Sequence, residues 1–157
     1  MLNQSLKNKK IIISAGASGI GLATVKVCLD RGATVFVSDI NDKYINKLKK
    51  NSKINKKLFV FNCDASDEYQ VVNLFEKIRK KTPKIDCLIN NVGIAGPTGT
   101  MDNLSSSEWE NTLRVNVFSH FYFNKLAIPM LKKNKGGSII NISSGAGIMG
   151  FPLRSAY

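Results

Sequence analysis

Three glycines, Gly16, Gly19 and Gly21, lie where one apolar run of the sequence gives way to another. Glycine has no side chain, so such a turn lets a ligand approach the backbone closely. A helix that begins there also offers unpaired N–H groups and the positive end of its dipole. The chemistry that suits this arrangement is the binding of a phosphate group. A tight turn without a ligand explains the same glycines equally well.

An acidic residue, Asp39, follows Gly21 by 18 positions at the end of another apolar run. A carboxylate at this distance can accept hydrogen bonds from the ribose hydroxyls of an adenosine, and it would repel a 2′-phosphate. Position 18 in the turn is Ser rather than a basic residue, and the nearest lysine is Lys43. The pattern predicts NAD rather than NADP. For Asp39 taken alone, a helix or turn cap is the alternative.

The elements that must hold these residues alternate along the chain. Short apolar runs predict strands over residues 11–14, 34–39, 58–63, 86–90 and 138–142. Helices are predicted over residues 19–31, 43–51, 66–80 and 105–131. This alternating order predicts an α/β fold with a doubly wound parallel sheet, because the crossovers between parallel strands are right-handed. Ligands of such sheets bind at the carboxyl ends of the strands.

Two of the predicted helices carry signals of their boundaries and faces. The helix over 19–31 has Ile20, Ala23 and Val27 on one side. In the helix over 66–80, Ser66 can serve as the N-terminal cap. One apolar stripe of that helix consists of Val71, Leu74, Phe75 and Ile78.

The long helix over 105–131 opens with a capping box, Ser105 and Glu108. Asn116 lies on a mostly apolar stripe of this helix, where a buried amide is costly unless its hydrogen bonds are satisfied. A structural Asn bonded to nearby backbone and a functional Asn are equally compatible with the pattern. His120, the only histidine, is expected to be packed or partly exposed rather than catalytic. The stripe comprises Trp109, Thr112, Leu113, Asn116, Val117, His120 and Phe121.

Length and composition limit the classes of protein that the chain could be. It has 157 residues, 43% of them hydrophobic and 22% charged, which predicts one globular domain. No apolar stretch approaches the ~20 residues of a membrane span, and no secretory signal is visible at the N-terminus. Cys28, Cys63 and Cys87 form no C-x-x-C spacing, so they are expected to be reduced thiols in a cytoplasmic protein without a metal site.

The net charge of +12 is compatible with two interpretations. One is a protein that binds nucleic acid or an anionic membrane. The other is a lysine-rich surface that is simply solvated. The lysine clusters at 43–57 and 132–135 are mixed with Asn and lack interleaved aromatic residues. The solvated surface is therefore the preferred interpretation, with no nucleic-acid or membrane partner.

The glycine turn has the spacing of one family in particular. Residues 14–21, Ser-Ala-Gly-Ala-Ser-Gly-Ile-Gly, resemble the T-G-x-x-x-G-x-G turn of the short-chain dehydrogenase/reductases. Ser14 replaces the Thr, and Ala15 replaces the first glycine. Four further segments resemble the same family in the right order. They are Cys63-Asp64, Asn90-Asn91-Val92-Gly93, Asn116, and Ile142-Ser143-Ser144 followed 13 residues later by Tyr157.

The resemblance implies a Rossmann-type domain and hydride transfer between NAD(H) and a small alcohol or ketone, as in 3-oxoacyl reductases and related enzymes. It assigns Tyr157 as the general acid/base, Ser144 as the residue that orients the substrate oxygen, and Asn116 as the holder of a relay water. No metal is implied. The cofactor residues that it implies are Gly16, Ser18, Gly19, Ile20, Gly21, Asp39, Asp64 and Asn91.

The position of Tyr157 at the end of this sequence leads to a further expectation. An unperturbed tyrosine has a pKa near ~10, and the family lowers it with a lysine four residues later. The position of that lysine lies beyond this sequence, and family members run to about 250 residues. We therefore expect an incomplete domain with five of the usual seven strands, from a full-length protein that forms homo-oligomers. A nucleotide-binding fragment without catalytic activity is the alternative function.

Overall fold

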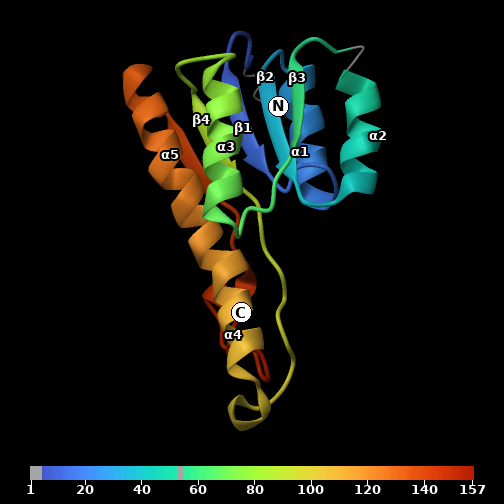
Figure 1. The fold of residues 1–157 in the computed structure, drawn as a ribbon, viewed down its shortest axis with the longest axis vertical. Helices are drawn as coiled ribbons and strands as arrows, with labels where there is room; N and C mark the ends of the chain where they lie inside the picture. The colour runs from blue at the N-terminus through green and yellow to red at the C-terminus, as the bar shows by residue number, and fades with distance from the viewer. Residues whose placement is uncertain (1–4, 53–54) are drawn as a thin grey trace.

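The computed structural model describes residues 5–52 and 55–157, and its centre is a parallel sheet (Figure 1). All pairs of neighbouring strands are parallel, and their order is β3-β2-β1-β4-β5. This arrangement confirms the predicted α/β fold with a doubly wound sheet. The strands are Lys10–Ser14 (β1), Thr34–Asp39 (β2), Leu58–Asn62 (β3), Cys87–Asn90 (β4) and Ser138–Asn141 (β5).

Helices cover both faces of the sheet (Figure 1). Between α4 and α5 the chain forms a π-helical turn, Arg114–Phe118. Together the three segments make one long rod whose α4 end extends past the sheet. No helix in the described part of the chain is long and apolar enough to span a membrane. The helices are Gly19–Asp30 (α1), Asp42–Ser52 (α2), Glu68–Arg79 (α3), Ser106–Leu113 (α4) and Ser119–Lys133 (α5).

The alternation of side chains along β1 divides the core into two layers. Ile11 and Ile13 pack with residues of α1 and α2 on one face. Ile12, on the other face, packs with residues of α3 and α5, including Phe75 and Phe123, whose rings meet edge to face at 5.5 Å. Because both faces of the sheet are covered, the inner strands are continuous apolar runs rather than alternating ones.

The buried face of α1 differs from the one expected from the sequence. Ile20 is 67% exposed and Val27 is 48% exposed, so neither faces the sheet. The helix instead buries Gly21, Val25 and Cys28. Apolar residues lie on several sides of this short helix, so its periodicity does not select a face. Gly21 sets the orientation, because only a residue without a side chain fits against the preceding turn.

The cap of α3 is also one position later than expected. Asp67, rather than Ser66, accepts hydrogen bonds from the backbone N–H groups of Tyr69 and Gln70. The Ser66 hydroxyl instead donates to the carboxylate of Asp64 at 2.7 Å. The side-chain amide of Gln70 also donates to Asp67 at 3.0 Å, and this hydrogen bond, together with the two from the backbone, holds the pKa of Asp67 below its usual value. The predicted stripe of α3 is buried as expected.

The long helix begins with the predicted capping box between Ser105 and Glu108, but it is not continuous. Its π-helical turn inserts extra backbone at residues 114–118, which changes the register of the following side chains. As a result Val117 and Phe121 are 55% and 56% exposed, although the sequence places them on the same stripe as Asn116. Asn116 and His120 remain directed toward the sheet edge, where both line a pocket.

At the amino-terminal ends of the strands, Asp86 connects its own segment to the start of β1 and to the end of α5. Its carboxylate accepts hydrogen bonds from the backbone N–H of Lys10, the ammonium of Lys9 and the amide of Asn134. Burial by itself would raise the pKa of Asp86, but these hydrogen bonds outweigh it and hold the pKa below its usual value. The carboxylate thereby fixes the start of β1 against the end of α5.

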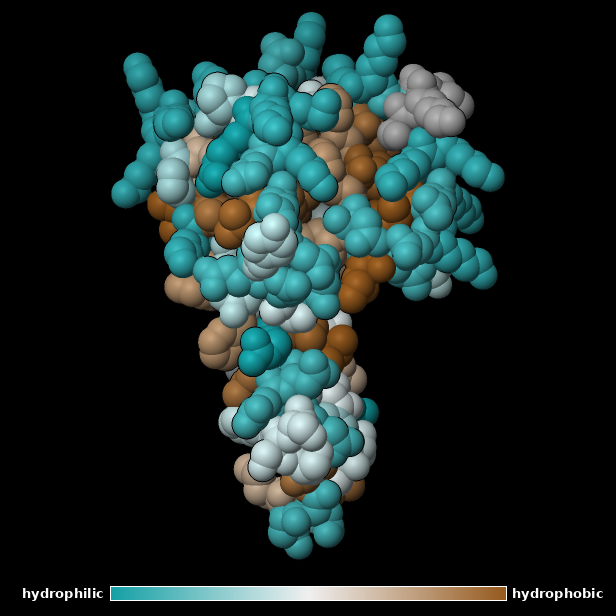
Figure 2. All heavy atoms as spheres, viewed as in Figure 1, coloured by the Kyte–Doolittle hydropathy of each residue, from teal (hydrophilic) through white to brown (hydrophobic). Residues whose placement is uncertain are grey.

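The lysines of α2 all lie on its solvent face. Figure 2 shows hydrophilic side chains over most of the wider half of the molecule, interrupted by apolar patches. The solvated-surface interpretation of these lysines stays a prediction, since exposed lysines are compatible with both interpretations of the net charge.

Candidate active site

The turn between β1 and α1 leaves the first amides of the helix free. The N–H of Gly16 donates to the carbonyl of Ser38 at 3.0 Å, and that of Ala17 donates to Asp39 at 3.0 Å. The Ser18 side chain makes no capping hydrogen bond, and the first helical hydrogen bond runs from Leu22 to Ser18. The N–H groups of residues 19–21 therefore have no partner within the described chain. This is the electrostatic environment that an anion requires.

The turn tolerates only glycine at position 21. A Cβ there would overlap the carbonyl oxygen of Ala15 and lie 2.6 Å from the Asn91 side-chain nitrogen. That nitrogen donates to the Ala15 carbonyl at 2.9 Å, and the Asn91 backbone N–H donates to the Ser14 hydroxyl at 3.0 Å. Asn91 thus holds the end of β4 against the turn. Ser14, which is 1% exposed, was identified only as the counterpart of the Thr in the family turn, and its hydrogen bond with Asn91 has no signal in the sequence.

Ala15 itself takes a positive φ of 48°, a region that favours glycine. The family turn has its first glycine at this position, so the departure noted in the sequence is accommodated by backbone strain. The left-handed conformation of an alanine costs roughly 1 kcal/mol or more. The hydrogen bonds from Asn91 and the neighbouring strands keep the turn in place.

One pocket of about 340 Å³ lies beside the turn at the carboxyl ends of β2 and β3, and both Asp39 and Asp64 line it. Asp39 is 8% exposed, and its two carboxylate oxygens accept from the N–H groups of Ala17 and Asn41. Asp64 accepts from the backbone N–H and the hydroxyl of Ser66. The carboxylate of Asp39 therefore both stabilises the turn and retains acceptor capacity toward the pocket.

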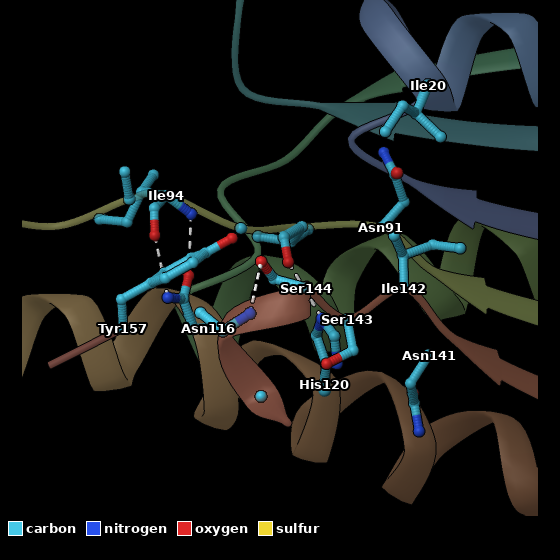
Figure 3. Close-up of a pocket in the computed structure, with 15 residues that line it drawn as sticks. Ile20, Asn91, Ile94, Asn116, His120, Asn141, Ile142, Ser143, Ser144 and Tyr157 are labelled. Carbon is cyan, nitrogen blue, oxygen red and sulfur yellow. Dashed lines mark hydrogen bonds between the residues drawn. The ribbon is translucent and has the colours of Figure 1, made fainter. Parts of the chain in front are cut away.

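A second pocket of about 460 Å³ lies at the ends of β4 and β5 (Figure 3). It brings together five of the site residues that the sequence predicts: Ile20, Asn91, Asn116, Ser144 and Tyr157. Gly16, Ser18, Gly19 and Gly21 line neither pocket, although their neighbours Ala15 and Ile20 each line one. Both pockets share the segment 92–94, which we call the bridging strip. A single elongated ligand could therefore occupy both.

The bridging strip is fastened to the long helix by two side chains. Asn116 accepts from the Ile94 backbone N–H at 2.8 Å and donates to the Ile94 carbonyl at 2.9 Å. His120 Nε2 lies 3.0 Å from the Val92 carbonyl oxygen, so it must carry the proton on that nitrogen. The sequence predicted a packed or partly exposed His120; the side chain is partly exposed and lines the pocket. Its contact with Val92 has no signal in the sequence.

Ser144 and Tyr157 come from the segment after β5. Ser144 caps a short 3₁₀ turn, Gly145–Gly147, by accepting a hydrogen bond from the Ala146 N–H at 3.3 Å. Tyr157 is 46% exposed, and its ring extends into the pocket in Figure 3. No hydrogen bond joins its hydroxyl to another described residue, so this hydroxyl is available to a ligand.

The cysteines offer no alternative chemistry. Burial, with smaller contributions from Asp64 and Asp67, raises the pKa of Cys63 to about 12. Burial likewise raises the pKa of Cys87 to about 11 and also raises the pKa of Cys28. Thiols with such pKa values are poor nucleophiles at neutral pH. The described residues contain no group of three potential metal ligands.

Comparison with known proteins places this geometry in a family. The family model described as short chain dehydrogenase matches residues 9–157. An uncharacterised oxidoreductase of Thermotoga maritima is 33% identical over 98% of this chain and 60% of its own length. The 3-oxoacyl-[acyl-carrier-protein] reductase FabG of the same organism is 31% identical over 97% of this chain and 62% of its own length.

Two further matches agree. A 3beta-hydroxysteroid dehydrogenase of Mediterraneibacter gnavus is 32% identical over 96% of this chain and 55% of its own length. The crystal structure of gox2181 superposes with a TM-score of 0.87 at 21% identity, over 95% of this chain and 58% of that one, which shows the same fold. The chain thus spans less than two thirds of the length of these relatives. With its sequence, fold and sheet-edge pockets in agreement, the chain belongs to the short-chain dehydrogenase family of oxidoreductases.

Proposed function

We propose that the protein carrying this chain is an NAD-dependent oxidoreductase that transfers a hydride between the nicotinamide and the carbon of an alcohol or ketone. The observation that carries the proposal is the pair of adjoining pockets. One contains the acidic residues suited to an adenosine, and the other contains Asn116, Ser144 and Tyr157. The bridging strip joins them, at the edge of the sheet where such folds bind dinucleotides.

The residues present fit a dinucleotide in three respects. The free amides of residues 19–21 suit its pyrophosphate. Asp39 can accept from the ribose hydroxyls, as described above. No Lys or Arg lines the pocket around Asp39 in the described part of the chain, so nothing there would neutralise a 2′-phosphate. These features favour NAD over NADP.

The cofactor supplies or accepts the hydride when it is bound, and the protein provides position and proton transfer. We assign the proton transfer to the Tyr157 hydroxyl, which has no hydrogen-bond partner among the described residues. The Ser144 hydroxyl oxygen accepts from Ala146, which leaves its own hydrogen free to donate to the substrate oxygen. Ile94 engages one N–H and one oxygen lone pair of the Asn116 amide, so a relay water would bind at the second N–H or the second lone pair.

The substrate class rests on the relatives as well as on the pocket. The names of a 3-oxoacyl-[acyl-carrier-protein] reductase and a 3beta-hydroxysteroid dehydrogenase support interconversion of a ketone and an alcohol. These names describe very different carbon skeletons. The proposal is therefore the alcohol/ketone class rather than one compound.

The test is the exchange of Tyr157→Phe in the full-length protein, followed through the absorbance of reduced nicotinamide. Loss of a general acid/base lowers turnover by about 10²- to 10⁴-fold, while NADH still binds. Tyr69→Phe is the matched control, because Tyr69 is 75% exposed on α3. Near-normal turnover of Tyr157→Phe would overturn the proposal. Wild-type protein that binds NADH but converts no alcohol or ketone would indicate a nucleotide-binding protein instead.

A further inference from the structure

Arg154 connects the two loops that border the pocket around Tyr157. It is partly buried and lies three residues before Tyr157. Its Nη1 donates to the carbonyl of Ala95 at 3.1 Å and to that of Gly96 at 3.1 Å. The carbonyl of Arg154 in turn accepts from the Tyr157 backbone N–H at 3.1 Å. One residue thus fixes the Tyr157 backbone and reaches across to the opposite loop.

A second contact holds the same two loops together. The Gly99 N–H donates to the Leu153 carbonyl at 3.0 Å. Leu153 has a φ of 61°, an uncommon conformation for a residue with a side chain. Such a conformation persists only where the surroundings determine it. In the described chain, hydrogen bonds between these loops come only from Leu153 and Arg154.

The opposite loop is itself anchored to the long helix. Ala95 and Gly96 directly follow Ile94, which Asn116 holds through both ends of its amide. A continuous series of contacts therefore runs from Tyr157 through Arg154 and Ala95 to Asn116. The Arg154 side chain forms no ion pair with a described carboxylate, and its hydrogen bonds within the described chain both go to this loop.

We propose that Arg154 is a positioning residue for Tyr157, which sets the distance of its hydroxyl from Ser144 and Asn116. This rests on the proposed function, because it assigns a purpose to the placement of Tyr157. Arg154 lines neither of the two pockets, so a role in turnover would act through Tyr157. Misplacement of a reacting group by about 1 Å costs on the order of 10²-fold in rate, so a connection of this kind affects turnover more than binding.

The proposal is tested in the full-length protein with Arg154→Met and Arg154→Lys. Arg154→Met keeps the length and apolar body of the side chain but removes the donors, and we expect kcat to fall about 10- to 100-fold. The KM of the substrate and the Kd of NADH should change by only about twofold. Arg154→Lys should recover most of the activity. The reason is that a single nitrogen donates to both carbonyls, and an ammonium group can do the same.

Arg79→Met is the matched control. Arg79 is exposed on α3, and it also donates to a backbone carbonyl, that of Leu126, at 3.4 Å. Its kcat should stay within about twofold of wild type, as for most surface substitutions. Thermal unfolding of all variants separates loss of position from loss of fold. The Tm of Arg154→Met should be close to that of the wild type, and the variant should be folded at the assay temperature.

Three results would overturn the positioning role. They are normal kcat in Arg154→Met, no recovery in Arg154→Lys, or a fall in kcat that is matched by weaker NADH binding and a lower Tm. The two proposals fail in distinguishable ways. An active Arg154→Met beside an inactive Tyr157→Phe overturns only the positioning role. A wild-type protein without turnover, or an active Tyr157→Phe, overturns both.

Discussion

Exchange of Gly21→Ala tests the glycine turn directly. The added Cβ would overlap the Ala15 carbonyl oxygen and lie 2.9 Å from the Cα of Gly16. Both neighbours are backbone atoms, so no flexible side chain can move aside. The Asn91 side chain, 2.6 Å from the new atom, would also have to leave the Ala15 carbonyl. The turn must therefore open, and its free amides move away from the pyrophosphate site.

The size of the effect follows from two opposing contributions. Overpacking costs typically about 1–3 kcal/mol. Alanine is better than glycine inside a helix by about 1 kcal/mol, and position 21 is the third residue of α1. The net loss in free energy of unfolding should therefore be only about 0–2 kcal/mol. The gain in helix propensity does not help NADH binding. The full overpacking cost of about 1–3 kcal/mol should therefore appear in the binding free energy, which weakens NADH binding by about 5- to 150-fold.

The assay is titration of the full-length protein with NADH, combined with urea unfolding of the same samples. Gly150→Ala is the control, because a Cβ at this position meets no atom within 4 Å. It should bind NADH as the wild type does. If Gly21→Ala binds NADH within about twofold of wild type, the close approach at position 21 does not shape the nucleotide site.

Three further predictions concern stability and reactivity. Asp86→Asn should lower the free energy of unfolding at pH 7, measured by urea unfolding, by about 1–3 kcal/mol. Because the folded-state pKa of Asp86 is depressed, its contribution is present above the unfolded pKa and disappears as pH falls through the folded one; a difference that is constant with pH would contradict this. Cys63 and Cys87 should react with iodoacetamide at pH 8 far more slowly in the folded than in the urea-unfolded chain, as measured by mass spectrometry; equal rates would refute their raised pKa values. Ala15→Gly should raise the free energy of unfolding by roughly 1 kcal/mol, and unchanged or lower stability would show that the positive φ of Ala15 carries no strain.

The sequence by itself determined the order of the elements and the residues at the strand ends. Apolar runs separated by helical periodicity identify the five strands, since parallel strands are buried on both faces. The glycine turn could be recognised because its requirement, backbone without side chains, is local. The capping box of Ser105 and Glu108 is local in the same way. Asn116 and Ser144 could be identified as candidate site residues because the family motifs have fixed spacing.

The tertiary structure alone decided which parts of these segments meet. The buried face of α1 depends on packing against the turn, and the π-helical turn before α5 reorients Val117 and Phe121. The bridging strip overlaps a segment that the family motif identifies, but its position across both pockets and its contact with His120 depend on the fold. Arg154 reaches a loop 58 residues earlier in the chain. Such contacts depend on how segments far apart in the sequence are brought together in space, and local sequence patterns do not encode which segments will meet.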